Sequence, residues 1–522
     1  MSESGGNNNI NNSIKQSAES ELLEFCHSDS LSEEGLREII ERQPHDVSNL
    51  NYDFFRAACL NGRVNEGIIQ CLLEYFPVAA NSISINGWSP LHCACLKNMT
   101  LGVIQLLINA APDSVRSVNR NDSMPLHCLC MNNALDQMTA IEILKLLLEK
   151  HLEAVQQADK TDSLPIHLAC NRGKSLEFCR VLIEAYPGSE RKMDEYGELP
   201  LHRACRSNTI STVQYLYKHY PDAINHAATE GAYPIHTAMM GLSGRSEPEN
   251  VIDVVKFLLE CDPNVKLQQF RGMISLLHFA CSLDYANSTI LTGIEVVKAI
   301  YDAHPEAIED NRFRAEFLEY HQGVQSFIGS QREYAREAKD HHLMTTPDGN
   351  GRLPLHLALN SENNATLGSI KLLVKANPPA LQTPDNGGVI PLHVACANHK
   401  PASVVQYLVG LDTSTLDAVD RDGNTALHYA CCVARHEIIA LLLNMFDAVS
   451  VSKRNTHGKL PIDLLWENSG EEDRESNEYT ESVFRLLKAY PELLMNVDIQ
   501  MQSPSAECPS QSGKKRKFDK EE

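Results

Sequence analysis

Apolar residues recur along the chain at a helical period. Ten separate runs place them at positions i, i+3 and i+4, as in GVIQLLINAAP, FCRVLIEAYP, VVKFLLECDP and SIKLLVKANP. This spacing puts the apolar side chains on one stripe of a helix, so each run predicts a half-buried helix. Proline usually follows the run directly, as at Pro187, Pro221 and Pro305. Because proline cannot continue the hydrogen-bond ladder of a helix, we expect the helices to end there.

A second, shorter pattern precedes these runs. The phrase Pro-Leu/Ile-His-x-Ala-Cys, or a close variant, places histidines at His92, His127, His167, His202, His236, His278, His356, His393 and His428. The gaps between them are 35, 40, 35, 34, 42, 78, 37 and 35 residues, so one unit repeats along the chain. The unit is predicted to be a turn, a short helix with proline in its first turn, a tight loop, a longer helix and an extended return. Such a helical hairpin must stack on its neighbours to bury its apolar face.

The repeated phrase resembles the ankyrin repeat, whose signature Gly-x-Thr-Pro-Leu-His-x-Ala-Ala lies within about 33 residues. The resemblance covers roughly residues 20 to 495. It implies an all-α fold, an ankyrin-type solenoid of about eleven or twelve helix-turn-helix repeats with short β-turn or hairpin loops. It also implies that the histidine ties its turn to the adjoining repeat by hydrogen bonds. The chain departs from the signature mainly by placing Cys at the second Ala and by losing the Gly-His that usually follows the first helix.

The register extends beyond the nine histidines in both directions. Upstream, Arg56 stands where a histidine would be expected, and the phrase LLEFC ending at Cys26 is a candidate N-terminal cap. Downstream, Asp463 replaces the histidine, as expected of an atypical terminal repeat. We therefore expect the solenoid to span residues 19–496. The polar, low-aromatic ends, 1–18 (rich in Asn and Ser) and 497–522, are expected to be disordered.

The gap of 78 residues between His278 and His356 is twice the usual period. Apolar residues between positions 313 and 328 fall near helical spacing among many charges. Two interpretations of residues 311–345 stay open. One is a degenerate repeat that keeps its two helices but loses the phrase. The other is a helical insertion that projects from the stack and offers a surface to a partner.

Composition and charge exclude several classes of protein. The 522 residues carry a net charge of −22, which disfavours direct binding of nucleic acid because phosphate contacts need clustered Lys and Arg. No stretch approaches the roughly 20 apolar residues of a membrane-spanning helix, and the first twenty residues have no apolar core of a secretory signal. The sixteen cysteines are too sparse for a disulfide scaffold. We expect reduced thiols and a monomeric, cytoplasmic protein, with the nucleus as a second location.

No motif in the chain indicates an enzyme. The sequence contains no glycine-rich phosphate loop, no Gly-x-Ser-x-Gly elbow and no His-Glu-x-x-His. Histidine with cysteine three residues later, as in His92 and Cys95, is superficially similar to a zinc site. Zinc needs four convergent ligands, however, and a pair that recurs in every unit is explained by stacking. We expect no cofactor, no metal and no catalytic residue.

The resemblance implies that partner proteins bind a concave surface made of turn tips and first helices. Its variable positions lie just before the proline and just after the cysteine of each phrase. Transferred to this sequence, they give the candidate partner-binding residues Trp88, Arg120, Asn121, Lys160, Arg172, Tyr196, Glu198, Arg206, Arg352 and Arg421. We expect a non-enzymatic scaffold or adaptor that binds other proteins.

Two alternatives to the scaffold or adaptor hypothesis remain. The basic run Lys514, Lys515, Arg516 and Lys517 resembles a nuclear-import signal. It would fit a nuclear adaptor that presents a partner to the transcription or ubiquitin machinery. A less favoured alternative is an enzyme whose site lies in the segment 311–342.

Overall fold

The computed structural model describes residues 19–42, 52–243, 250–271, 274–283, 289–309, 321–445 and 450–490. The chain divides into two compact units, unit 1 (residues 1–299) and unit 2 (residues 300–522). The termini expected to be disordered, the last residues of the expected solenoid and the basic run near residue 515 lie outside the described residues.

Unit 1 is built almost entirely of paired helices. Residues 19–27 are helical and pair in sequence with the second helix at Glu33–Glu41. The first helices of successive repeats are α3 (Asp53–Leu60), α5 (Pro90–Leu96), α7 (Pro125–Met131), α9 (Pro165–Asn171), α11 (Pro200–Ser207), α13 (Pro234–Met240) and α15 (Leu276–Ser282). The second helices are α2 (Glu33–Glu41), α4 (Glu66–Tyr75), α6 (Leu101–Ala110), α8 (Gln137–Lys150), α10 (Leu176–Ala185), α12 (Ile210–His219), α14 (Asn250–Cys261) and α16 (Ile290–Ala303), which ends in unit 2.

Short 3₁₀ helices and one β-ribbon complete unit 1. The 3₁₀ helices are η1 (Pro77–Asn81), η2 (Pro112–Arg116), η3 (Leu152–Gln156), η4 (Ser189–Arg191), η5 (Pro221–Asn225), η6 (Gly241–Ser243) and η7 (Val265–Leu267). The ribbon consists of β1 (Gln269–Phe270) and β2 (Ile274–Ser275), which pair antiparallel with Phe270 opposite Ile274.

Unit 2 repeats the same plan. Its first helices are α20 (Pro354–Ala358), α22 (Pro391–Ala397), α24 (Ala426–Cys432) and α26 (Pro461–Asn468). Its longer helices are α18 (Gln322–Glu337), α21 (Leu367–Ala376), α23 (Ala402–Leu411), α25 (His436–Met445) and α28 (Asn477–Ala489). Shorter elements are α19 (His341–Thr345), α27 (Glu471–Arg474), η8 (Pro305–Glu309), η10 (Pro378–Leu381), η11 (Thr413–Leu416) and η12 (Ser450–Ser452).

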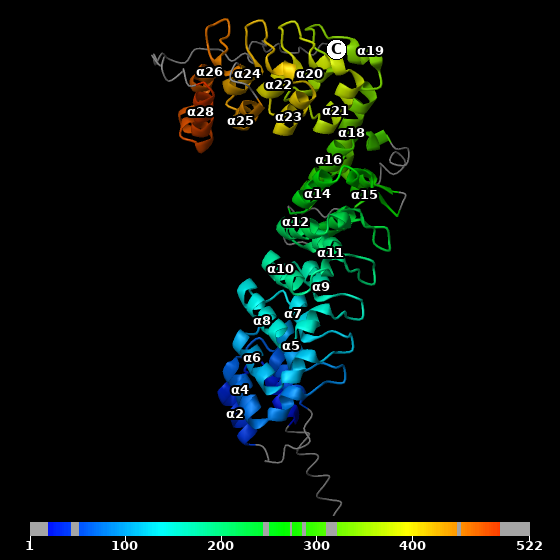
Figure 1. The fold of residues 1–522 in the computed structure, drawn as a ribbon, viewed down its shortest axis with the longest axis vertical. Helices are drawn as coiled ribbons and strands as arrows, with labels where there is room; N and C mark the ends of the chain where they lie inside the picture. Colours follow the sequence, from blue (N-terminus) through cyan, green and yellow to red (C-terminus); the bar gives the residue numbers. More distant parts are fainter. Residues whose placement is uncertain are drawn as a thin grey trace, which may run out of the picture. The chain divides into compact units, whose positions relative to one another are not determined.

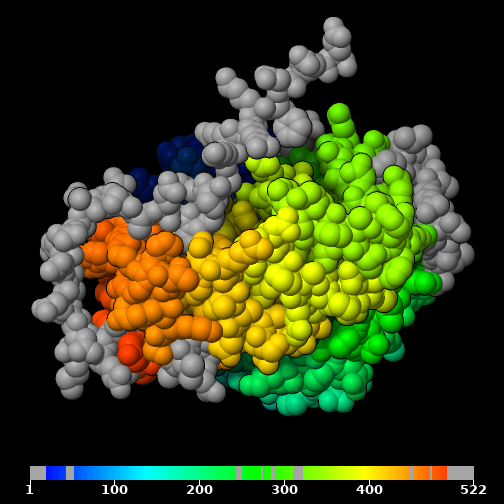
Figure 2. Space-filling view, turned by 90° about the horizontal axis from the view of Figure 1, so that it is seen from above, coloured from blue at the N-terminus to red at the C-terminus, as the bar shows by residue number. Residues whose placement is uncertain are grey.

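Within each unit, like helices pack on like helices. In unit 1, α5, α7, α9, α11 and α13 form one layer, α4, α6, α8, α10, α12 and α14 form the other, and the turns project beyond the first layer (Figure 1). In unit 2, α20, α22, α24 and α26 lie beside the layer of α21, α23, α25 and α28. Its yellow and orange repeats follow one another across the surface in chain order (Figure 2). The prediction of an all-α solenoid of stacked helical hairpins is confirmed.

The second repeat of unit 1 shows why these residues fold as they do. Thr100 caps α6 by accepting a hydrogen bond at 3.3 Å from the backbone N–H of Val103. The buried face of α6 consists of Val103, Ile104, Leu107 and Ile108, which is the stripe that the sequence pattern predicts. Burying each such side chain contributes about 2 kcal/mol relative to leaving it exposed. This face is covered by the neighbouring repeats, so a single hairpin would not hold it.

The proline after several second helices begins a further element, although Pro187 lies two residues before η4. The second helices end before Pro112, Pro221 and Pro305, as predicted, but the chain does not return at once as an extended strand. In each case the proline is the first residue of a 3₁₀ helix. Proline suits this position because its fixed φ matches a helical turn and its missing N–H needs no partner there. The extended return begins only after that turn.

The histidine of the repeated phrase joins neighbouring repeats through both of its ring nitrogens. In His393, Nδ1 accepts a hydrogen bond at 3.3 Å from the N–H of Ile390, the N-cap of its own helix. Nε2 donates at 3.1 Å to the carbonyl of Ala418 in the next repeat. The same pair of bonds is made by His92, His127, His167, His202, His356 and His428. An N–H can only donate and a carbonyl can only accept, so each ring is the neutral tautomer with its proton on Nε2.

Three repeats depart from this pair of histidine bonds, at Arg56, Asp463 and His236. Arg56 donates to Ser82 Oγ at 3.1 Å in the following turn, so it replaces the inter-repeat bond of the histidine. Asp463 accepts at 2.8 Å from the N–H of Leu460 and so keeps the N-cap bond, which is its one side-chain hydrogen bond within the described residues. His236 keeps its N-cap bond, but its Nε2 has no hydrogen-bond partner within the described structure and packs against Phe270 and Phe279.

Within the segment 311–345, the structure describes the residues from 321 onward. Its helix α18 packs on α21 through the fully buried Gln331. The Nε2 of Gln331 donates to the carbonyl of Asn364 at 3.1 Å, and its Oε1 accepts from Ser369 Oγ at 2.7 Å. The described part of 311–345 therefore belongs to the stack of unit 2. Whether the whole segment is a degenerate repeat or an insertion stays a prediction, because residues 310–320 lie outside the described residues.

Acid should weaken this stack. Burial lowers the pKa of His92 and His393 to about 4 and that of His202 to about 3, whereas an unfolded histidine titrates near 6.5. As the pH falls from 6.5 toward 4, the unfolded chain binds protons that the folded chain does not. The free energy of unfolding therefore falls, by up to about 1.4 kcal/mol per histidine for each unit of pKa difference. Urea unfolding followed by circular dichroism at pH 7.5, 6.0 and 5.0 should show the midpoint falling steadily.

Carboxylates remain ionised over most of this range, so the loss above pH 5 reports the histidines. Raising the pH from 7.5 to 8.5 should lower the midpoint again, because burial raises the pKa of thiols such as Cys93, to about 11, whereas unfolded thiols ionise near 8.5. Equal midpoints at pH 7.5 and 5.0 would show that the rings are not buried in the neutral form.

Candidate partner-binding surface

Eight turns of the stack are each held by one side-chain oxygen near their start, whereas the turn that begins at Ala228 has no such acceptor. In unit 1, the Oδ1 of Asn119 accepts hydrogen bonds from the N–H groups of Asn121 and Ser123, at 2.8 and 3.1 Å. The equivalent acceptors are Ser84, Asp159 and Asp194, and in unit 2 they are Asp348, Asp385, Asp420 and Asn455. A short polar side chain that bonds its own backbone two residues on is the usual device for such turns. The turns therefore share one backbone geometry.

One position in each turn requires the left-handed region of backbone space. Gly87 and Gly197 occupy it with φ of 81° and 69°. In the two turns between them the position is taken by Asp122 and Asp162, with φ of 55° and 52°. Aspartate is one of the few residues that tolerate this region. All four turns consequently keep the same path although only two of them contain glycine.

Neighbouring turns are joined by a ladder of backbone hydrogen bonds. In unit 1, the N–H groups of Arg120, Lys160 and Glu195 donate at 2.9 Å to the carbonyls of Asn86, Asn121 and Thr161 in the preceding turns. Unit 2 repeats the ladder from Asn386 to Asn350 and from Arg421 to Gly387. Because the turns are alike and joined at the same atoms, equivalent side chains of successive repeats lie in rows.

The ladder brings some of the predicted residues together. Arg120, Asn121, Lys160 and Tyr196 are exposed on three successive turns of unit 1. Arg421 is exposed on the equivalent row of unit 2. Arg172 is also exposed, but it lies after the last residue of α9, at the opposite end of that helix from the turn. Its position separates it from the row.

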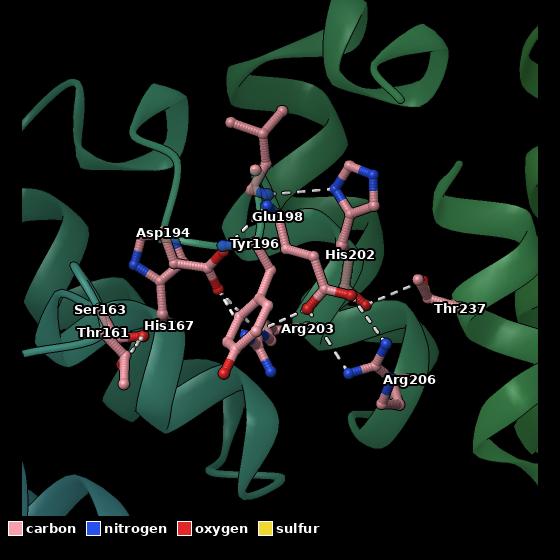
Figure 3. Close-up of polar contacts among 12 residues, drawn as sticks. Thr161, Ser163, His167, Asp194, Tyr196, Glu198, His202, Arg203, Arg206 and Thr237 are labelled. Atoms are coloured by element: carbon pink, nitrogen blue, oxygen red, sulfur yellow. Dashed lines mark hydrogen bonds and ion pairs between the residues drawn. The ribbon is translucent and has the colours of Figure 1, made fainter. Parts of the chain in front are cut away.

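The other predicted residues are engaged within the protein. Trp88 is half-buried, its backbone N–H donates to Ser84 Oγ at 3.0 Å, and its ring lies 5.8 Å from that of His92. Arg352 is half-buried and binds Asp348 of its own turn at 2.8 and 3.0 Å. Glu198 is buried and Arg206 half-buried, in a charged cluster that Figure 3 shows. Whether any of the ten residues contacts a partner stays a prediction.

The charged cluster links one turn to the helix that follows it. Arg203 donates through Nε and Nη2 to Asp194 Oδ2, at 3.0 and 2.5 Å, and its Nε lies 2.7 Å from Glu198 Oε2. Arg206 donates to Glu198 Oε1 at 2.7 Å. The guanidinium of Arg203 also lies 5.6 Å from the ring centre of Tyr196 (Figure 3). The Asp194 side chain is completely buried, so its charge depends on this pairing. Glu198 thus positions two arginines instead of presenting its own carboxylate.

The sequence reasoning missed a row of exposed apolar side chains on the turns of unit 1. Ile83, Val118 and Met193 each stand immediately before the turn acceptor and are 60%, 48% and 54% exposed. Ile85, at the position that Arg120 occupies in the next turn, is 88% exposed. Single exposed apolar residues are ordinary, but a row at one repeated position is not. The signal was an aliphatic residue at a fixed distance before successive prolines.

One pocket of unit 2 is rich in ionisable groups and lies between α18, α19 and α20. It is a pocket of about 460 Å³ whose lining includes Glu333, Tyr334, Glu337, His342 and Asp348. Burial, together with the neighbouring charge of Glu333, raises the pKa of Glu337. Among the residues that the structure describes, no group of three or more His, Cys, Asp or Glu side chains could hold a metal ion. No helix of the described chain is long and apolar enough to cross a membrane.

Removing Arg203 should destabilise the protein more than removing Arg206. Arg203→Met leaves the carboxylate of Asp194 buried without its cation and should lower the free energy of unfolding by about 3 kcal/mol. Arg206→Met removes a more exposed partner of Glu198, which keeps Arg203, and should cost less. Chemical denaturation of both variants checks the order.

The double variant Asp194→Asn/Arg203→Met should recover part of the loss. Asparagine can still accept the two turn hydrogen bonds, as Asn119 does, and it leaves no buried charge. If the double variant is less stable than Arg203→Met, the charge of Asp194 is not the reason for the loss.

Comparison with known families agrees with the repeat geometry. The family model of ankyrin repeats matches the chain in three copies, at residues 54–157, 138–228 and 369–455, which together cover half of the chain. The matched stretches contain the four uniform turns of unit 1 and the repeats from α21 to η12 of unit 2. None of the curated proteins matches the chain. The stacked helical hairpins, the paired hydrogen bonds of the histidines and the matching family model together place this chain in the ankyrin repeat family.

Proposed function

We propose that the protein is a non-enzymatic adaptor that binds other proteins through the turn rows of its repeats. Ankyrin repeats are generally protein–protein interaction modules. The observation that carries the proposal is the row of exposed apolar and charged side chains on the joined turns of unit 1, from Ile83 to Tyr196. Exposed aromatic and arginine side chains are those that most often dominate a protein interface.

The turns are suited to binding because they are already ordered. Each is held by its side-chain acceptor and by the ladder, so the backbone has little freedom to lose on association. The side chains of Arg120 and Lys160 extend from this fixed backbone. Binding would therefore cost mainly the immobilisation of side chains. The mechanism is recognition by a preformed surface.

For the cell compartment we propose the cytoplasm, because the composition carries no sign of export. A nuclear adaptor that serves the transcription or ubiquitin machinery is the second candidate. It rests on the basic run from Lys514 to Lys517. A fluorescent fusion of the full chain, compared with one in which these four residues are alanine, separates the two locations.

An enzyme is the weaker alternative, and the pocket beside α18 is the observation that favours it. Glu333, Glu337 and His342 are the ionisable side chains there that have no part in an ion pair within the described residues. Asp348 is already bound by Arg352 and by two backbone amides of its turn. The ankyrin family is typically non-enzymatic, so we place this alternative behind protein binding.

Changing the row should abolish partner capture without unfolding the protein. We expect Ile85→Asp/Tyr196→Ala, used as bait in cell extract with quantitative mass spectrometry, to lose about tenfold or more of the partners that the unchanged chain enriches. Both side chains are exposed, so the unfolding midpoint should stay close to that of the unchanged chain.

The matched control is Lys145→Glu, an exposed position on the second helix α8 and away from the turns. It should retain the partners. Loss of the same partners from both variants, or retention by both, would contradict the assignment of binding to the turn row.

A further inference from the structure

The two units present different chemistry on the same turn geometry. At the position before the turn acceptor, the four turns of unit 1 carry Ile83, Val118, Ala158 and Met193. Unit 2 carries Pro347 and Pro384 in its first two turns and Val419, 41% exposed, in its third. At the position after the acceptor, unit 1 carries the larger side chains Ile85, Arg120, Lys160 and Glu195. Unit 2 carries Gly349, Asn386, Arg421 and Thr456 there. Because the backbone is alike, this contrast belongs to recognition and not to folding.

The order of side chains along unit 1 is itself informative. The first turn is apolar, with Ile83 and Ile85. The fourth presents Met193 and Tyr196, exposed at 54% and 53%, on either side of the acidic pair Asp194 and Glu195, of which Glu195 is exposed. Between them, Arg120 and Lys160 stand on the second and third turns. Neither cation is in an ion pair with any residue that the structure describes. Two exposed cations therefore lie between two apolar ends on four turns joined by one ladder, and the exposed Asp122 and Asp162 follow them on the same two turns.

The spacing of the turns fits one kind of backbone. Packed helices lie about 8–10 Å apart, and the turns follow the spacing of their helices. A polyproline II segment advances about 3.1 Å per residue and has three residues per turn. Every third side chain of such a segment therefore faces the same side and advances about 9 Å. Seven residues of an α-helix, its nearest repeat on one face, advance about 10.5 Å and fall out of step over successive turns.

We propose that these four turns of unit 1 bind an extended, acidic segment of a partner protein, about ten residues long. Its pattern is apolar-x-x-acidic-x-x-acidic-x-x-apolar. One apolar end lies on Ile83 and Ile85, the two carboxylates face Arg120 and Lys160, and the other apolar end lies on Met193 and Tyr196. The inference rests on the proposed function, because it names the class of partner for the same surface. The motif is the same in either chain direction.

Charge complementarity is the reason for the acidic centre. Each exposed cation gains a partner on binding, and opposite charges across an interface speed the encounter and reject partners of the wrong sign. The basic pair is local, since the chain as a whole carries −22. A segment of the opposite pattern, with basic residues in the centre, would be repelled at both turns. The row thus selects both the sign of the charge on the partner segment and the spacing of its charged residues.

Selection from a random library of twelve-residue peptides displayed on phage tests this inference. The baits are the full chain, the variant Arg120→Glu/Lys160→Glu and the control Arg421→Glu, which alters an exposed turn cation of unit 2. The full chain and the control should enrich peptides with two acidic residues three positions apart, flanked by apolar residues. The charge-reversed variant should enrich Lys or Arg at the same two positions and should bind the first set about tenfold more weakly or worse.

Four results would overturn the inference. These are the absence of any enriched motif, a spacing of four or seven residues, the same motif with all three baits, or an equal effect of Arg421→Glu. None of them would overturn the proposed function by itself. If Ile85→Asp/Tyr196→Ala still loses its captured partners, the row binds folded surfaces and not extended segments. Matching unfolding midpoints for the three baits exclude a folding defect.

Discussion

The whole stack depends on a histidine ring that makes two different hydrogen bonds at once. Nδ1 of His393 accepts from the start of its own helix, and Nε2 donates to the next repeat. Only the neutral tautomer with its proton on Nε2 can make this pair of bonds. The ring is fully buried, so its environment also favours the neutral form. One residue type therefore sets the start of a helix, the spacing of two repeats and the pH range in which both persist.

Substitutions at that position confirm which bond each repeat needs. Arg56 reaches forward to Ser82 and so serves a repeat that has another repeat after it. Asp463 has no donor to offer a following repeat and retains only the bond to Leu460. His236 keeps the ring but lacks an acceptor within the described residues, and aromatic rings surround it instead. At the junction after α13, the bond from this histidine to the next repeat is missing within the described residues.

Much of the fold follows from the sequence, because helical period and the repeated phrase act locally. The buried stripe of α6 and the proline at the start of α7 are both predicted from neighbouring residues. The 3₁₀ turns after Pro112 and Pro221 are not, since the same proline is equally compatible with an extended chain. Side-chain pairing is harder still. Glu198 was predicted to face a partner because of its position in the repeat, yet Arg203 and Arg206 reach back to it from the following helix. The aliphatic row was missed for the opposite reason, because an apolar residue in a loop is usually assigned to packing.

In the turns, the atoms that fix the backbone path are different from the side chains that face solvent. Backbone atoms and one acceptor, variously Ser84, Asn119, Asp159 or Asp194, fix the path of each turn. The exposed side chains at the tips, such as Arg120 and Lys160, contribute little to that path, so exchanging them should cost little folding free energy. A gene for such a chain can therefore change what it recognises by single substitutions, while the architecture that displays them is inherited intact.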